Sequence, residues 1–249
     1  MPKKNPTILV TGGSGLLGSE IRKLEPSVIA PTHAEMDVLD IASVEKALKK
    51  YKPQIVIHAA AAMRPPEHET DPIPGLTVNI QGTVNMARVC HDLSIRLVYT
   101  STDYIYKGDG PHLESEPVLG AHKFAWSKLG GECAVRLLTN SLILRLSFGP
   151  VPFPWEKVYE NQTNSKLYVD EIAPLVLQAA LSEAIGVLNI GGPRTTLEEY
   201  AKRTRPDIKT IPLPEWAPQD TSLELGKMRD TLSIKNLWSV LKHGNKKNS

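Results

Sequence analysis

The chain has 249 residues, of which 41% are hydrophobic and 22% charged, and its formal net charge is +2. A globular composition of this kind buries a sizeable core without disulfides, and the balanced charge predicts neither a nucleic-acid nor a membrane partner. No apolar run approaches the roughly 20 residues that cross a bilayer.

Short apolar runs alternate with amphipathic stretches along most of the chain. We predict strands at residues 7–10, 27–30, 55–58, 96–100, 142–146 and 186–190. We predict helices at residues 16–24, 43–51, 77–93, 124–138 and 170–181. Ser43 is expected to cap the second helix, and a capping box at Thr196 begins a further one. This alternation implies right-handed βαβ units and a doubly wound parallel α/β sheet covered on both faces.

The pattern becomes irregular beyond residue 149, where prolines recur. A strand at 186–190 and the capped helix after it return to the alternating pattern. We therefore predict a main domain at residues 1–149 to which residues 185–205 return. The remaining parts, 150–184 and 206–249, are predicted to form a smaller loop-rich region that binds the substrate.

A glycine-rich turn joins the first predicted strand to the first predicted helix, with the spacing G-x-x-G-x-x-G. The first glycine permits a tight turn, the second allows close approach of a pyrophosphate, and the third lets the helix pack on the sheet. The free N–H groups of the helix N-terminus attract phosphates. The context predicts a Rossmann-type dinucleotide-binding domain whose phosphate contacts come from Gly12, Ser14, Gly15, Leu16, Leu17 and Gly18.

The end of the second predicted strand bears on the choice between NAD and NADP. An acid there favours NAD, whereas a basic residue accepts the additional phosphate of NADP. The sequence offers His33 and no immediate acid, although Glu35 is near, so it favours NADP slightly and leaves both cofactors open. Asp37 and Val38 are expected to contact the adenine, and the alternative for Asp37 is a turn residue.

Several further motifs resemble those of the extended short-chain dehydrogenase/reductase superfamily, and most closely those of the dTDP-4-dehydrorhamnose reductase family. They extend over most of the chain and are highly specific for the superfamily, but only moderately specific for the substrate. The matching stretches are residues 11–18, 37–40, 58–61, 79–83, 101–106, 127–132, 144–147, 168–173 and 218–223.

The resemblance implies a catalytic hydroxyl, tyrosine and lysine. In such enzymes the tyrosine protonates the carbonyl oxygen, the lysine lowers the pKa of that tyrosine and holds the nicotinamide ribose, and the hydroxyl binds the carbonyl. Thr102 and Lys128 match the hydroxyl and the lysine, whereas Phe124 stands where the family has the tyrosine. Further cofactor contacts are expected from Ala59, Ala60, Ala61, Asn79, Thr100, Leu146 and Lys128.

Phenylalanine has no ionisable group, so Phe124 keeps the helical spacing to Lys128 and loses the proton donor. Three explanations remain open. The phenylalanine was introduced to trap a bound complex, it belongs to a protein that binds nucleotides without reducing a substrate, or another group supplies the proton. The candidates for that group are His122, Tyr104, Tyr106 and a water held by Thr102. Each explanation predicts that the cofactor still binds.

The resemblance implies an NAD(P)-dependent reductase of a nucleotide-linked 4-keto-deoxysugar, as in dTDP-rhamnose biosynthesis. The alternatives are a dinucleotide-binding regulatory subunit and a nucleotide-sugar epimerase or dehydratase. A homodimer through two long helices is compatible with the superfamily. Weaker candidates for ligand contacts are Arg64, Trp126, Trp155, Lys166, Arg194 and Arg229, while His58 is expected to be a hydrogen-bonded core residue.

Compartment and metal content follow from the remaining residues. Cys90 and Cys133 lie in helical patterns and are expected to be buried or half-buried thiols of a reducing compartment. The N-terminus has no signal-peptide pattern, so we predict a cytoplasmic protein. No cluster of His, Cys and Asp suggests a metal.

Overall fold

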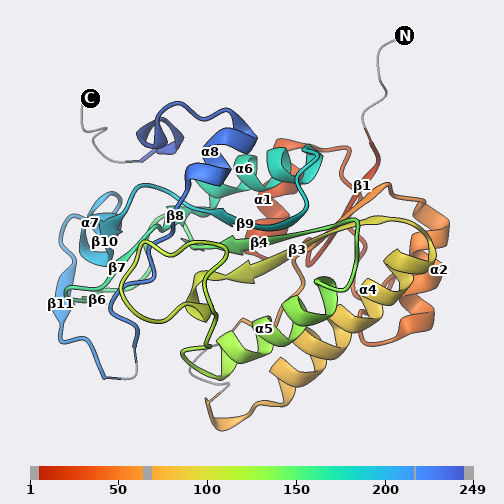
Figure 1. Cartoon of the computed structure of the whole chain (residues 1–249), viewed down its shortest axis with the longest axis horizontal. Coiled ribbons are helices and arrows are strands. Elements are labelled where there is room, and N and C mark those ends of the chain that lie inside the picture. The colour runs from red at the N-terminus through yellow and green to blue at the C-terminus, as the bar shows by residue number, and fades with distance from the viewer. Residues whose placement is uncertain (1–5, 64–68, 216, 244–249) are drawn as a thin grey trace.

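A five-stranded parallel sheet forms the centre of the protein. The computed structural model describes residues 6–63, 69–215 and 217–243. The strands lie in the order β1-β2-β3-β4-β9. This parallel order confirms the predicted doubly wound α/β fold (Figure 1). The bounds are β1 (Ile8–Thr11), β2 (Ile55–His58), β3 (Arg96–Thr102), β4 (Ser141–Leu146) and β9 (Gly186–Ile190).

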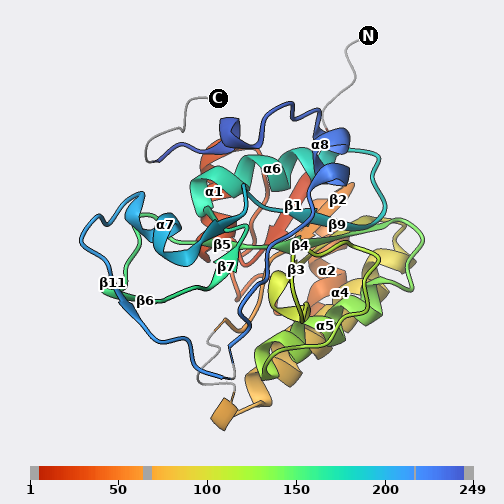
Figure 2. The same cartoon turned by 60° about the vertical axis from the view of Figure 1, so that its left-hand side comes forward.

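Helices cover both faces of the sheet. One face carries α1 (Leu16–Leu24) and α6 (Val169–Leu181), with α8 (Gly226–Leu232) packed beside α6. The other face carries α2 (Ile41–Tyr51), α4 (Gly82–Asp92) and α5 (Lys123–Val135) (Figures 1 and 2). Every strand of the sheet is therefore enclosed on two sides.

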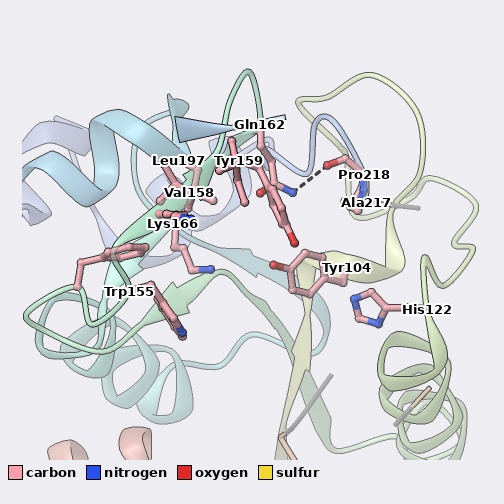
Figure 3. Close-up of a pocket in the computed structure, with 13 residues that line it drawn as sticks. Tyr104, His122, Trp155, Val158, Tyr159, Gln162, Lys166, Leu197, Ala217 and Pro218 are labelled. Atoms are coloured by element: carbon pink, nitrogen blue, oxygen red, sulfur yellow. Dashed lines mark hydrogen bonds between the residues drawn. The ribbon is translucent and has the colours of Figure 1, made fainter. Parts of the chain in front are cut away.

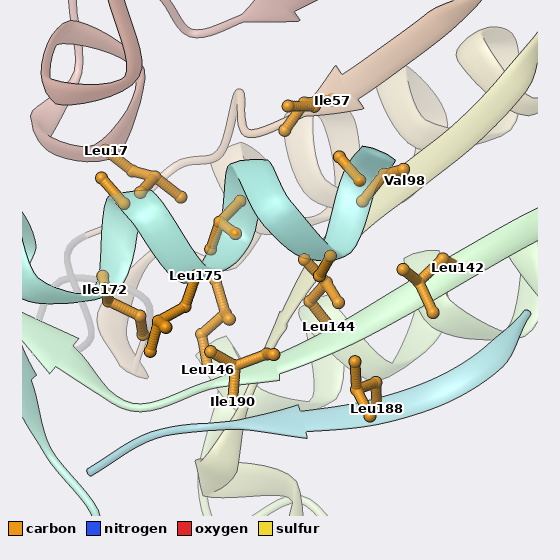
Figure 4. Close-up of a cluster of buried hydrophobic side chains, with 14 of the residues drawn as sticks. Leu17, Ile57, Val98, Leu142, Leu144, Leu146, Ile172, Leu175, Leu188 and Ile190 are labelled. Carbon is orange, nitrogen blue, oxygen red and sulfur yellow. The ribbon is translucent and has the colours of Figure 1, made fainter. Parts of the chain in front are cut away.

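The strand sequences explain this double covering. Successive residues of a strand point to opposite faces, so a strand that is apolar throughout must be buried on both. Val10 packs toward α1 and α6 while its neighbour Leu9 packs toward α2 and α4. Figure 4 shows the first of these two cores, in which α6 lies on side chains of the central strands such as Val98 and Leu144.

A smaller loop-rich region lies beyond the carboxyl ends of the strands (Figure 2). Its own apolar cluster includes Phe153, Tyr168 and Tyr200. Three strand pairs build it, together with α7 (Leu197–Lys202). The pairs are β5 (Phe148–Gly149) with β8 (Leu167–Tyr168), β6 (Lys157–Tyr159) with β11 (Lys209–Ile211), and β7 (Thr163–Asn164) with β10 (Thr195–Thr196).

Two predicted elements differ from the structure. Residues 27–30 form a single bridge from Ile29 to β1 in place of a full strand, and proline flanks the segment on each side. The predicted helix 77–93 begins as a π-helix, η1 (Gly75–Gln81), and becomes regular only in α4.

Two predicted side-chain environments also differ. Asp40 caps α2 in place of Ser43, whose hydroxyl accepts the Asp37 N–H instead. Cys90 is buried as expected, whereas Cys133 is exposed. In the part of the chain that the structure describes, no helix has both the length and the apolarity needed to cross a membrane.

Candidate functional site

The glycine turn lies where the order of the strands reverses. From β1 the chain first runs to the Ile29 bridge on one side of β1, and it later returns to β2 on the other side. The crevice between these two connections is where open α/β sheets bind ligands. Gly12 has a φ of +68° and lies so close to β2 that a Cβ would stand 2.9 Å from the Cα of Ala60. A Cβ on Gly18 would overlap the carbonyl oxygen of Gly12. No side chain caps the first turn of α1, so its N–H groups face the crevice.

A chain of hydrogen bonds fixes the floor of this crevice. The Ala60 N–H donates to the Thr11 hydroxyl, which in turn lies 2.8 Å from Nδ1 of His58. The other ring nitrogen lies 3.1 Å from the Thr83 hydroxyl, which donates to the Asn79 carbonyl. Since each hydroxyl has one proton to give, His58 accepts at Nδ1 and donates from Nε2. Burial and the nearby Lys128 lower the pKa of His58 to about 3, so it is the neutral core residue that we predicted.

The adenosine end of the crevice is less enclosed. His33 has 83% of its side chain exposed, and Nε2 lies 3.6 Å from an oxygen of Asp37. That carboxylate accepts the Leu39 N–H and so acts as a turn residue. Glu35 is engaged by Thr32 and by the Tyr51 hydroxyl. Glu35 and Asp37 therefore both already have hydrogen-bond partners within the protein.

Val38 lies in the turn before α2, Thr100 lies in β3 and Leu146 ends β4. Val38 is buried, and its side chain lies against Gly82 at the start of α4. Thr100 donates to the carbonyl of His58 and so joins β3 to β2. Leu146 is buried at the end of β4, directly beside Thr102 of β3.

Lys128 is held beneath the carboxyl end of β3. It is 3% exposed, and its ammonium nitrogen lies 4.3 Å from the centroid of the Tyr99 ring. The Tyr99 hydroxyl donates to the Lys128 carbonyl at 3.0 Å. Burial lowers the pKa of Lys128 to about 7, while the charge of Glu132 acts in the opposite direction. The position of the lysine is thus fixed, and its pKa lies close to neutral pH.

Two neighbours complete this part of the site. The Asn79 amide donates to the Ser127 hydroxyl at 2.8 Å and exchanges two hydrogen bonds with the backbone of Ala62. It is fully buried in the π-helix and holds η1 against the residue that precedes Lys128. Phe124 is 2% exposed one turn before Lys128, and its ring stacks on His122 with centroids 5.9 Å apart.

Thr102 ends β3, and its hydroxyl is 3.3 Å from the carboxylate of Asp103. Asp103 in turn accepts the hydroxyls of Ser147 and Thr221. Burial raises the pKa of Asp103, while Lys166 and these hydroxyls act to lower it. Because Thr221 belongs to the C-terminal part of the chain, Asp103 ties the loop-rich region to the strand that carries Thr102.

The titration of Lys128 gives a first prediction. Its native pKa of about 7 lies below the value of 10.5 that is usual for lysine, so between these values the unfolded chain binds more protons. The free energy of unfolding should therefore rise with pH between 7 and about 10 in the wild type, relative to Lys128→Met. Chemical denaturation of both proteins across this range measures the difference. Parallel pH profiles would refute a depressed pKa at Lys128.

A cavity of about 310 Å³ opens between the end of β3 and the loop-rich region. Figure 3 shows Tyr104 and His122 on one side and β6 residues on the other, with the Lys166 ammonium directed inward. Lys157 and Lys166 supply positive charge, and none of the described lining residues is a carboxylate. Its lining is Tyr104, His122, Phe153, Trp155, Lys157, Val158, Tyr159, Gln162, Lys166, Leu197, Ile211, Ala217 and Pro218.

Sequence reasoning named some of these residues and missed others. Tyr104, His122, Trp155 and Lys166 are named by the sequence analysis and line the cavity, whereas Phe153, Lys157 and Tyr159 are not named by it. These residues form an aromatic and basic cluster within the proline-rich segment, and this cluster is the sequence feature that could have indicated them.

The other weak candidates lie elsewhere. Trp126 is half exposed and packs on Gly120, while Arg194 is paired with Asp220. Arg229 reaches only backbone carbonyls near the C-terminus, and Arg64 lies outside the described residues. Among the described residues there is no cluster of potential metal ligands.

Comparison with known proteins gives a consistent family. Residues 6–149 match the family described as "RmlD substrate binding domain". The chain is 36% identical over 133 residues to dTDP-4-keto-6-deoxy-D-glucose reductase of Streptomyces niveus, covering 51% of this chain and 46% of that protein. It is 30% identical over 139 residues to methionine adenosyltransferase 2 subunit beta of Xenopus laevis, covering 51% and 42%. The match thus spans less than half the length of either relative.

Solved structures share the fold over nearly the whole chain. The crystal structure of dTDP-4-dehydrorhamnose reductase from Bacillus anthracis in complex with NADP has a TM-score of 0.80 and 20% sequence identity. The similarity covers 97% of this chain and 95% of that one. At this identity the comparison establishes the architecture, including the loop-rich region that lies beyond the family match.

Proposed function

Because this chain belongs to the RmlD substrate binding domain family, we propose that it binds NADP or NAD at the glycine turn and reduces the 4-keto group of a nucleotide-linked deoxysugar. The observation that carries the proposal is the position of the cavity. A cavity lined by aromatic residues and lysines reaches the segment that follows Thr102, on the same sheet edge as the glycine turn. Cofactor and sugar sites would therefore adjoin at one place.

The residues of the crevice fit a dinucleotide. The uncapped N–H groups of α1 suit the pyrophosphate, and the glycines leave no Cβ between it and the backbone. Lys128 would hold the nicotinamide ribose, as the resemblance implies, and Asn79 donates to the hydroxyl of the residue that precedes this lysine. A bound reduced nicotinamide would supply hydride to the ketone carbon. Thr102 would turn its hydroxyl proton from Asp103 to the ketone oxygen, and the charge of Lys128 would stabilise the charge that develops there.

The cavity fits a nucleoside diphosphate sugar. Aromatic rings such as Trp155 and Phe153 offer apolar faces to a base, and lysines offer charge to a diphosphate. The described lining residues include no carboxylate that would repel such an anion. We therefore propose that the part of the loop-rich region around this cavity binds the substrate, whereas α6, which falls within the predicted range 150–184, covers the sheet.

Charge removal from the cavity tests this assignment. Lys166→Met and Lys157→Met should each weaken binding of dTDP by about tenfold or more, since a charge-assisted phosphate contact is worth about 1.5–3 kcal/mol. Calorimetric titration with dTDP measures the loss. Lys202→Met is the matched control, because Lys202 is an exposed lysine of α7 that pairs with Glu198. Equal affinities in all the variants would place the nucleotide elsewhere.

Reduction itself is tested with dTDP-4-keto-6-deoxy-D-glucose. We expect consumption of NADPH or NADH that depends on this sugar and is lost in Lys128→Met. If no oxidation of either cofactor occurs in the wild type or in Phe124→Tyr, the reductase proposal fails.

A second candidate is a dinucleotide-binding regulatory subunit. Phe124 supports it, because the tyrosine implied by the resemblance is missing, and one relative is by its name a subunit of another enzyme. This candidate predicts cofactor binding without turnover in both the wild type and Phe124→Tyr. The same two proteins and the same assay therefore separate the candidates.

A further inference from the structure

Reduction of a ketone needs a proton donor, and Phe124 cannot be that donor. The inference below rests on the proposed reductase function. The chain has seven tyrosines, all within the described residues, so each can be examined as a replacement.

Five of these hydroxyls are already engaged away from the cavity. Tyr99 donates to the Lys128 carbonyl, and Tyr106 donates to Asn189 while it accepts from Arg145. Burial also raises the pKa of Tyr106 to about 12. The hydroxyls of the other three lie in contacts with Glu35, Thr204 and Leu167; these tyrosines are Tyr51, Tyr168 and Tyr200. None of the five lines the cavity.

His122 lines the cavity but is a poor acid in its observed state. Its Nδ1 accepts the backbone N–H of Ala125 at 3.2 Å, where it caps the start of α5. While Nδ1 accepts this hydrogen bond it carries no proton, so the ring proton lies on Nε2. Loss of that proton would leave an imidazolate, which is far less stable than a phenolate. His122 thus serves to position its neighbours.

Tyr104 and Tyr159 remain, and they come from opposite walls. Tyr159 belongs to β6 of the loop-rich region. Tyr104 follows Thr102 by two residues, and its N–H donates to the Thr102 hydroxyl at 3.3 Å. Figure 3 shows the Tyr104 hydroxyl directed into the cavity. Thr102, the predicted ligand of the ketone oxygen, and Tyr104 are therefore fixed together in the short helix η2 (Asp103–Ile105) and its cap.

The His122 ring lies between Tyr104 and Phe124, the residue that lacks the expected hydroxyl. The Tyr104 and His122 ring centroids are 5.0 Å apart, and His122 is stacked on Phe124 at 5.9 Å. The His122 ring thus separates the phenol of Tyr104 from Phe124, and the phenol lies on the cavity side. Lys166 lines the same cavity.

We infer that Tyr104 is the general acid of this chain and replaces the hydroxyl that Phe124 lacks. As the C=O π bond breaks, the ketone carbon receives the hydride of the reduced nicotinamide, and the oxygen takes the proton from the Tyr104 hydroxyl. The ketone is reduced to an alcohol and the nicotinamide is oxidised. The phenolate is then reprotonated from the bulk solvent, which supplies the one proton that the reduction consumes.

Four proteins test this inference: the wild type, Tyr104→Phe, Phe124→Tyr and the double variant. Tyr104→Phe should lower kcat by about 100-fold or more with little change in KM, because general acids contribute about 10²–10⁴-fold. Phe124→Tyr should restore turnover in the Tyr104→Phe background. Calorimetry should show unchanged binding of dTDP and NADPH in all four. The wild-type kcat should decline at alkaline pH as the phenol ionises, and Tyr104→Phe should lose this decline.

Three outcomes would overturn the inference. Turnover that survives in Tyr104→Phe excludes the tyrosine as the acid. A double variant as slow as Tyr104→Phe, or with a raised KM, indicates a substrate-binding role instead. Turnover in Phe124→Tyr but not in the wild type supports the reductase function and shows that Tyr104 does not replace the lost hydroxyl.

Discussion

Replacement of Arg145 by methionine should cost about 3–5 kcal/mol of stability, one of the largest losses expected for a single change in this protein. Arg145 and Glu132 are both fully buried, and the guanidinium binds both oxygens of that carboxylate. The guanidinium also donates to the Tyr106 hydroxyl at 2.6 Å. Although burial acts to raise it, these contacts hold the pKa of Glu132 below its usual value. Removal of Arg145 would leave a buried carboxylate without its main partner.

The consequence should extend to the site. Glu132 lies one helical turn beyond Lys128 on α5, and its pairing with Arg145 joins that helix to β4. We therefore expect Arg145→Met to weaken cofactor binding as well as to lower the denaturation midpoint. Arg136→Met is the control, since Arg136 binds the same carboxylate from a half-exposed position and should cost about 1 kcal/mol or less. Similar losses for the two variants would contradict this interpretation.

The change Gly18→Ala should have an effect of comparable size. A Cβ at this position would overlap the carbonyl oxygen of Gly12 and press on the backbone of Gly13. Backbone atoms cannot give way as a flexible side chain can, so the turn and α1 would have to separate. We expect a loss of about 3 kcal/mol or more and no measurable cofactor binding. Denaturation and calorimetric titration with NADPH measure the two effects.

Gly15→Ala provides the matched comparison. Gly15 has φ near −75°, a conformation open to alanine, and its Cβ would lie 3.1 Å from the Gly12 carbonyl oxygen. Stability should change by about 1 kcal/mol at most. The methyl group would nevertheless project where a pyrophosphate approaches the helix, so the affinity for NADPH should fall about tenfold or more. If Gly15→Ala bound NADPH as tightly as the wild type, the phosphates would not lie against this turn.

The parallel sheet and its covering helices could be predicted because their signals are local. An apolar run such as β2 and a glycine turn before α1 each specify their structure within a few residues. For the same reason the sequence wrongly predicts a full strand around Ile29. Its composition is that of a strand, but the prolines at 26 and 31 limit its pairing with β1 to one bridge.

The π-helix and the cavity depend on contacts that sequence order does not reveal. The π-helix η1 accompanies the burial of Asn79 against Ser127, and Gly131 lacks the Cβ that would collide with the Asn79 carbonyl. The cavity is enclosed by strand pairs of two or three residues whose partners are distant in the chain. Such short pairs show no periodicity, so Lys157 and Tyr159 could not be placed beside Tyr104 from sequence alone.

Direct titration of the wild-type protein with NADPH and with NADH tests dinucleotide binding at the glycine turn, on which every functional proposal depends. We expect saturable binding of at least one of the two well below about 1 mM, and a marked loss of that binding in Gly15→Ala. Failure of both dinucleotides to bind the folded wild-type protein at about 1 mM would contradict it, whatever the role of Tyr104.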